Sequence, residues 1–160
     1  MLLLSQEHGD IEAPTDFRRA FCCAGSPDVW VGVQILGLAA LLQNGRVLAV
    51  AGNAPRTLCD PTAHAEMRVI RAAAAALGRD RLEDCDLWVT LEPCAMCAGA
   101  IAHARIARVY YGASDPKGGA VEHGSRFFAQ PTCHHRPEVY PGIGEGEGAA
   151  LLRQFFAGRR

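Results

Sequence analysis

The sequence lacks an apolar run long enough to cross a membrane as a helix. Its longest predominantly apolar stretch, residues 29–42, has fourteen residues and includes Gln34, whereas a spanning helix needs about 18 or more. The first ten residues also lack a basic segment, and they are too short for the apolar segment of a secretory signal peptide. We therefore expect a protein without a membrane span that works in the cytoplasm.

The sequence also lacks an even set of cysteines. The chain has seven, and an odd number without a signal peptide argues against a disulfide framework. We therefore expect a reducing environment. Free thiols are expected at five of the seven positions, which are Cys22, Cys23, Cys59, Cys85 and Cys133.

A strong excess of charge of either sign is missing as well, because the net charge is −1. Bulk electrostatics therefore neither predicts nor excludes a nucleic-acid partner. Residues 101–160 are net positive, which weakly favours an anionic partner at that end. Internal repeats and low-complexity linkers are absent too, and so we expect residues 1–160 to form a single domain.

Apolar periodicity and turn residues predict a layered α/β domain. Asn44-Gly45 between two apolar runs predicts a β-hairpin, because both residues tolerate positive φ. Asp60 is expected to cap a helix that Pro61 opens and Gly78 ends. Helices alternate with strands after the hairpin, so the order predicts an antiparallel first pair followed by helix–strand units. The expected strands are residues 35–42, 46–52, 86–92, 108–113 and 138–140, and the expected helices are residues 61–77, 93–105 and 148–160.

Two cysteines, Cys94 and Cys97, stand three residues apart directly behind Pro93 at the start of an expected helix. This spacing places both sulfurs on one face of the helix, and the positive end of the helix dipole favours their thiolate forms. His64 is expected near the start of the preceding helix. If both helices follow neighbouring strands, their N-termini meet at one edge of the sheet, where the three side chains can bind one Zn²⁺. Three protein ligands leave the fourth position for water, which indicates a catalytic rather than a structural site.

Glu66 gives this pattern its specificity. It lies two residues after His64, about 200° around an ideal helix, and so we interpret it as a proton shuttle over the metal rather than as a ligand. The alternatives are a redox Cys-x-x-Cys pair, half of a structural zinc site, or two small core residues. A redox pair does not need the upstream His-Ala-Glu, and a structural site needs a fourth ligand close by. His103 is too far away to be this fourth ligand, because it lies six residues beyond Cys97, nearly two turns away from the helix N-terminus.

The segments "HAE" at residues 64–66 and "PCAMC" at residues 93–97 resemble the H-x-E…P-C-x-x-C pattern of the zinc-dependent nucleobase deaminases. Cytosine, guanine, deoxycytidylate and riboflavin-pathway deaminases share this metal motif. Residues 111–120 and 134–139 are similar to the bacterial tRNA-specific adenosine deaminases in particular, and the resemblance extends over residues 35–160. It implies an α/β fold of the cytidine-deaminase type, with three layers, α/β/α, around a five-stranded mixed sheet.

The same resemblance implies an activity and its residues. The enzyme would be a homodimer that binds a tRNA anticodon stem-loop and converts its wobble adenosine to inosine, with Zn²⁺ as cofactor and Glu66 as the catalytic proton carrier. Asn53 is similar in position to the amide that reads the flipped base. Asp115 and Lys117 are similar in position to the loop that contacts the backbone and the ribose. An ordinary solvated turn explains Lys117 equally well.

Two other functions stay open from the sequence. The first is a free-base or nucleoside deaminase that acts on guanine or cytosine, because the metal motif alone does not separate these substrates. The second is a zinc-stabilised RNA-binding module without catalysis. Glu66 argues against that module, because a structural site has no use for a carboxylate that is not a ligand.

Residues 1–34 depart from the family pattern. Relatives usually open with an alanine-rich amphipathic helix, whereas Gly25 and Pro27 interrupt any helix here. The valine-glycine step of the family corresponds either to Val31-Gly32 or to Leu36-Gly37, and each choice implies a different insertion.

Overall fold

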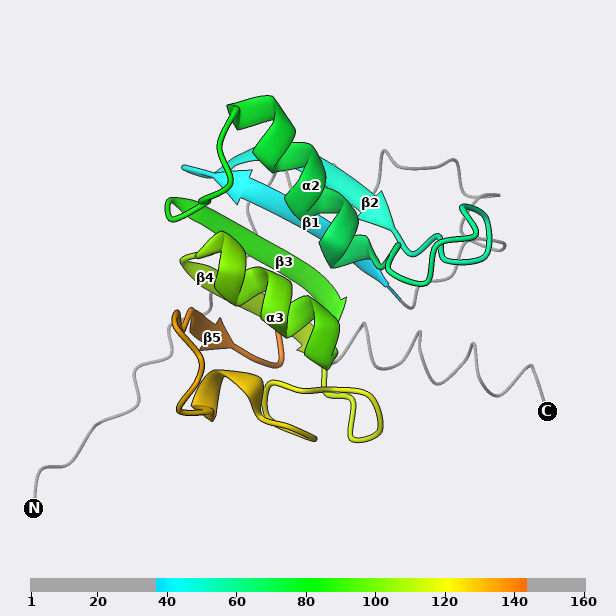
Figure 1. Ribbon diagram of the computed structural model, residues 1–160, viewed down its shortest axis with the longest axis vertical. Helices are drawn as coiled ribbons and strands as arrows, with labels where there is room; N and C mark the ends of the chain where they lie inside the picture. Colours follow the sequence, from blue (N-terminus) through cyan, green and yellow to red (C-terminus); the bar gives the residue numbers. More distant parts are fainter. Residues whose placement is uncertain (1–36, 144–160) are drawn as a thin grey trace, which may run out of the picture.

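Five strands form one mixed sheet in the computed structural model of the chain, which describes residues 37–143 (Figure 1). This confirms the five-stranded mixed sheet expected from the sequence. The strands are β1 (Leu38–Gln43), β2 (Arg46–Gly52), β3 (Cys85–Leu91), β4 (Arg108–Ala113) and β5 (Glu138–Tyr140). The helices are α2 (Ala65–Leu77), α3 (Ala95–Ala104) and the short 3-10 helix η1 (Phe127–Ala129).

The order of the strands across the sheet is β2-β1-β3-β4-β5. β1 pairs antiparallel with both β2 and β3, whereas β4 pairs parallel with β3 and with β5. Asn44 and Gly45, with φ of 50° and 77°, close the β1–β2 hairpin, as a two-residue turn requires. Because β2 and β3 are both antiparallel to β1, they run in the same direction and end at the same edge of the sheet.

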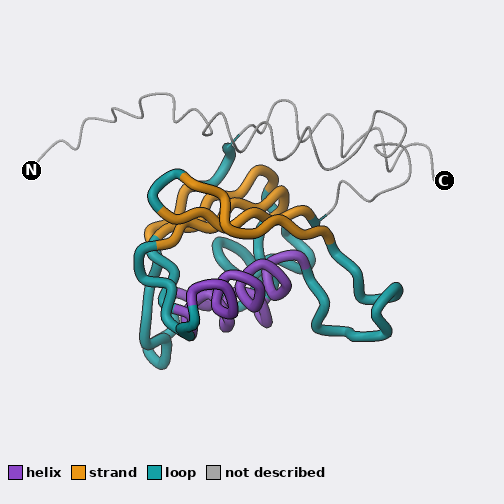
Figure 2. The backbone as a smooth tube through the Cα atoms, turned by 90° about the horizontal axis from the view of Figure 1, so that it is seen from above, coloured by secondary structure: helices purple, strands orange, loops and turns teal. Residues whose placement is uncertain are grey.

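Helices α2 and α3 lie side by side on one face of the sheet, and α2 packs on β1 and β2 (Figures 1 and 2). The alanine-rich sequence of α2 favours a helix. Gly78 ends it with a left-handed φ of 63°, and its N–H points to the last free carbonyls of the helix. The core between helices and sheet is completely buried; its members include Leu41, Val69, Leu87, Ile101, Val109 and Tyr111.

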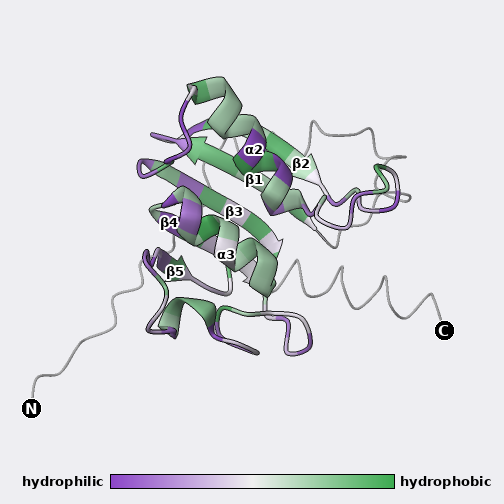
Figure 3. Ribbon diagram, viewed as in Figure 1, coloured by the Kyte–Doolittle hydropathy of each residue, from purple (hydrophilic) through white to green (hydrophobic). Residues whose placement is uncertain are grey.

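The opposite face of the sheet carries a separate apolar layer. Trp88, Tyr110 and Tyr140 stack across β3, β4 and β5, with ring centroids 4.1 Å and 4.8 Å apart. Ala40 and Leu42 of β1 extend this layer. Figure 3 shows the resulting hydrophobic strands beside more hydrophilic turns. A sheet with two apolar faces is typical of a layered α/β domain.

The expected bounds of β2, β4 and β5 agree with the structure, whereas the expected helix starts are wrong. Helix α2 begins at Ala65, because Asp60 does not cap it. The Oδ1 of Asp60 instead accepts hydrogen bonds from the N–H and the hydroxyl of Thr62, at 2.8 Å and 2.7 Å, and so closes a local turn. Helix α3 begins at Ala95, and Cys94 is its capping residue rather than a member of its first turn.

Some expectations lie outside the described residues. These are the helix at residues 148–160 and the atypical segment at residues 1–34. Within residues 37–143, no helix is long and apolar enough to cross a membrane.

Candidate metal centre and catalytic pocket

The starts of α2 and α3 meet at one edge of the sheet. β1 lies between β2 and β3, so the strands that precede the two helices are not neighbours in the sheet. The helix starts still meet, because β2 and β3 both run antiparallel to β1 and end at the same edge. The chain turns there into the two helices, whose capping residues are His64 and Cys94.

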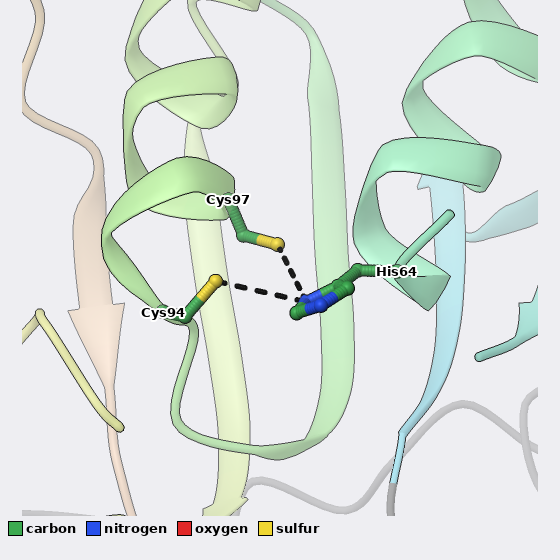
Figure 4. Close-up of side chains that lie close together, drawn as sticks. All are labelled: His64, Cys94 and Cys97. Carbon is green, nitrogen blue, oxygen red and sulfur yellow. Dashed lines mark hydrogen bonds between the residues drawn. The ribbon is translucent and has the colours of Figure 1, made fainter. Parts of the chain in front are cut away.

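Three side chains point toward one another at this edge (Figure 4). The Nδ1 of His64 lies 3.6 Å from the Sγ of Cys94 and 3.6 Å from the Sγ of Cys97. All three ligand atoms lie within 4.8 Å of one another. Cys97 is completely buried, whereas His64 and Cys94 are half-buried and contribute to the wall of a pocket.

This arrangement fits a zinc ion. Two thiolate sulfurs and one imidazole nitrogen are ligands that zinc prefers. With Zn–S bonds of about 2.3 Å and Zn–N bonds of about 2.0–2.1 Å, sulfur and nitrogen on a tetrahedral ion lie about 3.6 Å apart. Both sulfur–nitrogen distances have this value. His64, Cys94 and Cys97 can therefore hold zinc, and they leave one coordination position for another group.

The two thiols have opposite electrostatic environments. A hydrogen bond from the side chain of Cys97 is the main reason that the pKa of Cys94 falls to about 5; burial opposes this shift, and the N–H groups of Cys97 and Met96 support it. The same hydrogen bond, together with burial, raises the pKa of Cys97. The pair thus holds one negative charge easily. A divalent cation completes such a site, because it replaces the remaining proton.

Glu66 lies in the first turn of α2 and is only 8% exposed. Burial raises the pKa of its carboxyl, and the negative charge at Cys94 raises it further; the Glu66 N–H, His64 and Cys97 act in the opposite direction. The residue lines the same pocket as His64 and Cys94. A buried carboxyl with a raised pKa, close to the candidate metal ligands, is suited to take up and release a proton.

Asn53 follows the last residue of β2 and holds the start of α2. Its Oδ1 accepts a hydrogen bond from the N–H of Ala65 at 2.8 Å, and its own N–H donates to the carbonyl of Gly37 at 2.8 Å. Gly37 has a φ of 120°, and a Cβ there would lie 2.0 Å from the Nδ2 of Asn53. The N–H groups of Gly37 and Leu38 point to the hydroxyl of Thr90, at 3.3 Å and 3.2 Å. The absence of a side chain at Gly37 thus lets the Asn53 amide sit in the pocket wall.

Asp115 and Lys117 lie in the loop after β4. Asp115 lines the pocket, and its Oδ1 accepts hydrogen bonds from the N–H groups of Lys117 and Gly118, both at 3.0 Å. Lys117 is exposed and is not one of the described residues that line the pocket. The pocket therefore brings together Glu66, Asn53 and Asp115 but not Lys117.

The pocket has a volume of about 210 Å³. This is below the range of about 300–1,000 Å³ that is typical for drug-sized ligands, so the pocket suits one small group. Thr90 and Glu92 also line it, and neither is among the site residues expected from the sequence. The signal for Glu92 was its position, because a carboxylate stands directly between a buried strand and Pro93.

A family model described as the cytidine and deoxycytidylate deaminase zinc-binding region matches residues 29–113. These residues include the whole cluster and Glu66. The tRNA-specific adenosine deaminase of Agrobacterium fabrum is 63% identical over 122 residues, which cover 76% of this chain and 80% of that protein.

Solved structures show the same relationship. A structure from a study of A-to-I editing by tRNA:A34 deaminases at the wobble position of transfer RNA is similar with a TM-score of 0.71 and 54% identity; the match covers 88% of this chain and 95% of that one. The guanine deaminase of Bacillus subtilis is similar with a TM-score of 0.55 and 32% identity, and here the match covers 93% and 94%. The likeness is thus greater to the tRNA deaminase than to the guanine deaminase.

Proposed function

Because the chain belongs to the cytidine and deoxycytidylate deaminase family, we propose that it hydrolyses the exocyclic amine of a nucleobase. The substrate is adenosine at the wobble position of a tRNA anticodon, and the products are inosine and ammonia. The observation that carries this choice is the 63% identity to a tRNA-specific adenosine deaminase over 80% of that protein's length. Residues 1–160 act as one catalytic domain.

In this proposal, His64, Cys94 and Cys97 hold the zinc ion. Zinc, when bound, supplies a Lewis acid that lowers the pKa of a coordinated water toward neutrality. Glu66 accepts a proton from the attacking water at its carboxylate and delivers it to the purine ring nitrogen. After the water oxygen has bonded to C6, Glu66 moves the remaining proton of the added hydroxyl to the exocyclic amine, which leaves as ammonia when the C6–N bond breaks. The support for this role is its burial beside the cluster and its raised pKa.

The substrate contacts in the proposal come from Asn53, Asp115 and Lys117. Asn53 reads the flipped base through its amide, and its support is a fixed position in the pocket wall next to Glu66. Asp115, which lines the pocket, contacts the ribose, and Lys117, which is exposed, contacts the RNA backbone. The loop carries both residues.

The partner in this proposal is the anticodon stem-loop of a tRNA, and the enzyme works in the cytoplasm as a homodimer. The flipped wobble nucleotide fits the small size of the pocket, because only one base has to enter it. The rest of the stem-loop stays on the protein surface.

The experiment that tests the function is incubation of the zinc-loaded protein with an anticodon stem-loop that has adenosine at the wobble position. Inosine is detected by mass spectrometry after nuclease digestion. We expect inosine at this position and none in a matched stem-loop whose adenosine lies in the stem. Guanine, cytosine and cytidine are offered in parallel.

Two results would contradict the proposal. Rapid release of ammonia from a free base or nucleoside, with no inosine in the stem-loop, would favour a free-base or nucleoside deaminase. Tight binding of the stem-loop without any ammonia release would favour an RNA-binding module.

A further inference from the structure

Glu92 is a charged side chain that the proposed chemistry does not use. It directly follows β3, it is 3% exposed, and its side chain is completely buried. Its Oε1 accepts hydrogen bonds from three consecutive N–H groups, those of Val121, Glu122 and His123, at 3.0, 2.9 and 3.0 Å. Its Oε2 accepts one from the N–H of Asp115 at 3.0 Å and lies 2.7 Å from the Nδ1 of His123.

These hydrogen bonds join the two ends of one loop, residues 114–123. Asp115 stands at the beginning of the loop, and residues 121–123 form its end. A single carboxylate therefore closes the loop, in the way that a metal ion or a disulfide closes loops elsewhere. Bonds from N–H groups to a carboxylate are stronger than bonds between neutral groups.

The middle of the loop lies directly against Glu92. A Cβ at Gly119 would lie 2.4 Å from the Cδ of Glu92 and 2.5 Å from the carbonyl oxygen of Asp115, so only glycine fits there. The next residue, Ala120, donates its N–H to the carbonyl of Pro93 at 2.9 Å. The loop is thus wrapped around the carboxylate and fastened to the segment that leads into α3.

The same loop forms one wall of the pocket, through Asp115 and Gly118. The metal cluster and Glu66 are held differently, because they belong to the starts of α2 and α3. We infer that Glu92 is a positioning residue, which holds the 114–123 loop on the pocket wall and so sets substrate affinity without touching the reacting atoms. The effect on substrate affinity rests on the proposed function, whereas the holding of the loop by Glu92 does not.

The test uses Glu92→Gln in the full-length, zinc-loaded protein. Glutamine keeps the size of the side chain, but its NH₂ replaces one acceptor oxygen and faces N–H donors. We expect the amides of Asp115, Val121, Glu122 and His123 to exchange hydrogen at least about tenfold faster, because bonds to a charged acceptor are lost. Zinc content and the exchange of amides in α2 stay as in the wild type.

Kinetics on the anticodon stem-loop give the second measurement. We expect KM to rise by about tenfold or more, whereas kcat changes by less than about threefold, because the loop contributes to binding and not to proton transfer. The matched control is Glu83→Gln, which removes the same charge from an exposed side chain. It should change neither the exchange of the loop amides nor KM.

His123 provides a second variant that leaves the carboxylate in place. His123→Ala removes only the side-chain bond to Oε2, and we expect the same changes at a few-fold size. His123→Asn restores a donor near the position of Nδ1 and should return both values toward those of the wild type. This pair decides the question even where Glu92→Gln does not fold.

Three results would overturn the inference. These are unchanged exchange of the loop amides in Glu92→Gln and His123→Ala, a loss of kcat with unchanged KM, and a loss of zinc that places the effect at Cys94. Failure of the wild-type protein to produce inosine is a different result. It contradicts the proposed function, whereas the exchange measurement still decides whether Glu92 holds the loop.

Discussion

Glu66 and Glu92 are both buried glutamates of one pocket, 8% and 3% exposed, but their surroundings give them opposite properties. Burial raises the pKa of Glu66, and the nearby negative charge of Cys94 adds to this effect. Burial acts in the same direction on Glu92. There it is outweighed by hydrogen bonds from the N–H groups of Asp115, His123 and Glu122 and from the His123 side chain, which lower the pKa to about 2.

The difference shows that burial alone does not decide what a carboxyl group can do. The number of N–H donors around it does, because each donor stabilises the charged form. Glu92 is surrounded by backbone donors and therefore stays charged at all ordinary pH values. Glu66 has few donors and can change its protonation state. One carboxylate thus fixes a loop, and the other can carry a proton.

The largest expected effect concerns the metal beside Glu66. The purified protein should contain about one zinc ion per chain, and Cys94→Ala or His64→Ala should lose both zinc and activity, because only two ligands remain. Elemental analysis of the dialysed proteins measures this. Cys59→Ala, which changes an exposed thiol, is the control. Stoichiometric zinc in both variants would show that His64 and Cys94 do not bind the metal.

The next effect concerns the support of α2, the helix that carries Glu66. Gly37→Ala places a Cβ 2.0 Å from the Asn53 amide at a φ of 120°. We expect it to lower the free energy of unfolding by about 1–3 kcal/mol, because the backbone is strained. Activity should fall as well, because Asn53 is displaced from Ala65.

The control for Gly37 is Gly45→Ala. Gly45 also has a positive φ, of 77°, but a Cβ there meets no atom within 4 Å. Thermal melts and inosine assays of both variants separate backbone strain from the contact with Asn53. Equal loss of activity in the two variants would show that the contact has no special importance.

A smaller effect concerns cysteine thiols, whose pKa values also depend on their surroundings. Burial and the nearby Asp84 raise the pKa of Cys85 to about 11, whereas that of Cys94 is about 5. Cys85 should therefore react with iodoacetamide at pH 8 at least about 100-fold more slowly than the exposed Cys59, because the thiolate is the reactive form. Peptide mass spectrometry of the zinc-loaded protein measures the two rates. Similar rates would show that Cys85 is accessible and ionised.

The smallest effect concerns an ion pair outside the pocket. The Nε of Arg108 donates to Asp86 at 2.7 Å, but the arginine side chain is 46% exposed. Arg108→Ala should cost less than about 1 kcal/mol in the free energy of unfolding, because water and salt screen exposed pairs. Denaturant melts measure it. A loss of free energy of unfolding comparable to that of Gly37→Ala would show that the exposure of an ion pair does not predict its strength in this protein.

The sequence predicted those parts of the molecule that depend on local pattern. The Asn44-Gly45 turn, the bounds of β2, β4 and β5, and the end of α2 at Gly78 follow from period and turn chemistry over a few residues. The start of α2 could not be predicted from local pattern, because Asp60 binds Thr62 instead of capping the helix.

The convergence of His64, Cys94 and Cys97 was predicted on the condition that the two preceding strands are neighbours, whereas β1 separates them in the sheet. The spacing of the residues and their positions at the starts of two helices carried that prediction. The role of Glu92 was not predicted, because its donors come from residues 23 to 31 positions further along the chain. The position of Glu92 before Pro93 marks it in the sequence, but no local pattern predicts contacts over such a distance along the chain.

The most direct test of the central claim compares Glu66→Gln and Glu92→Gln on the same anticodon stem-loop, at saturating enzyme and in a single turnover. Glu66→Gln should lower the rate of inosine formation by about 10²–10⁴-fold with zinc still bound, because it removes the proton carrier. Glu92→Gln should lower this saturated rate by less than about threefold and act on affinity instead. Equal losses of the saturated rate in the two variants would contradict the division of roles between the two glutamates.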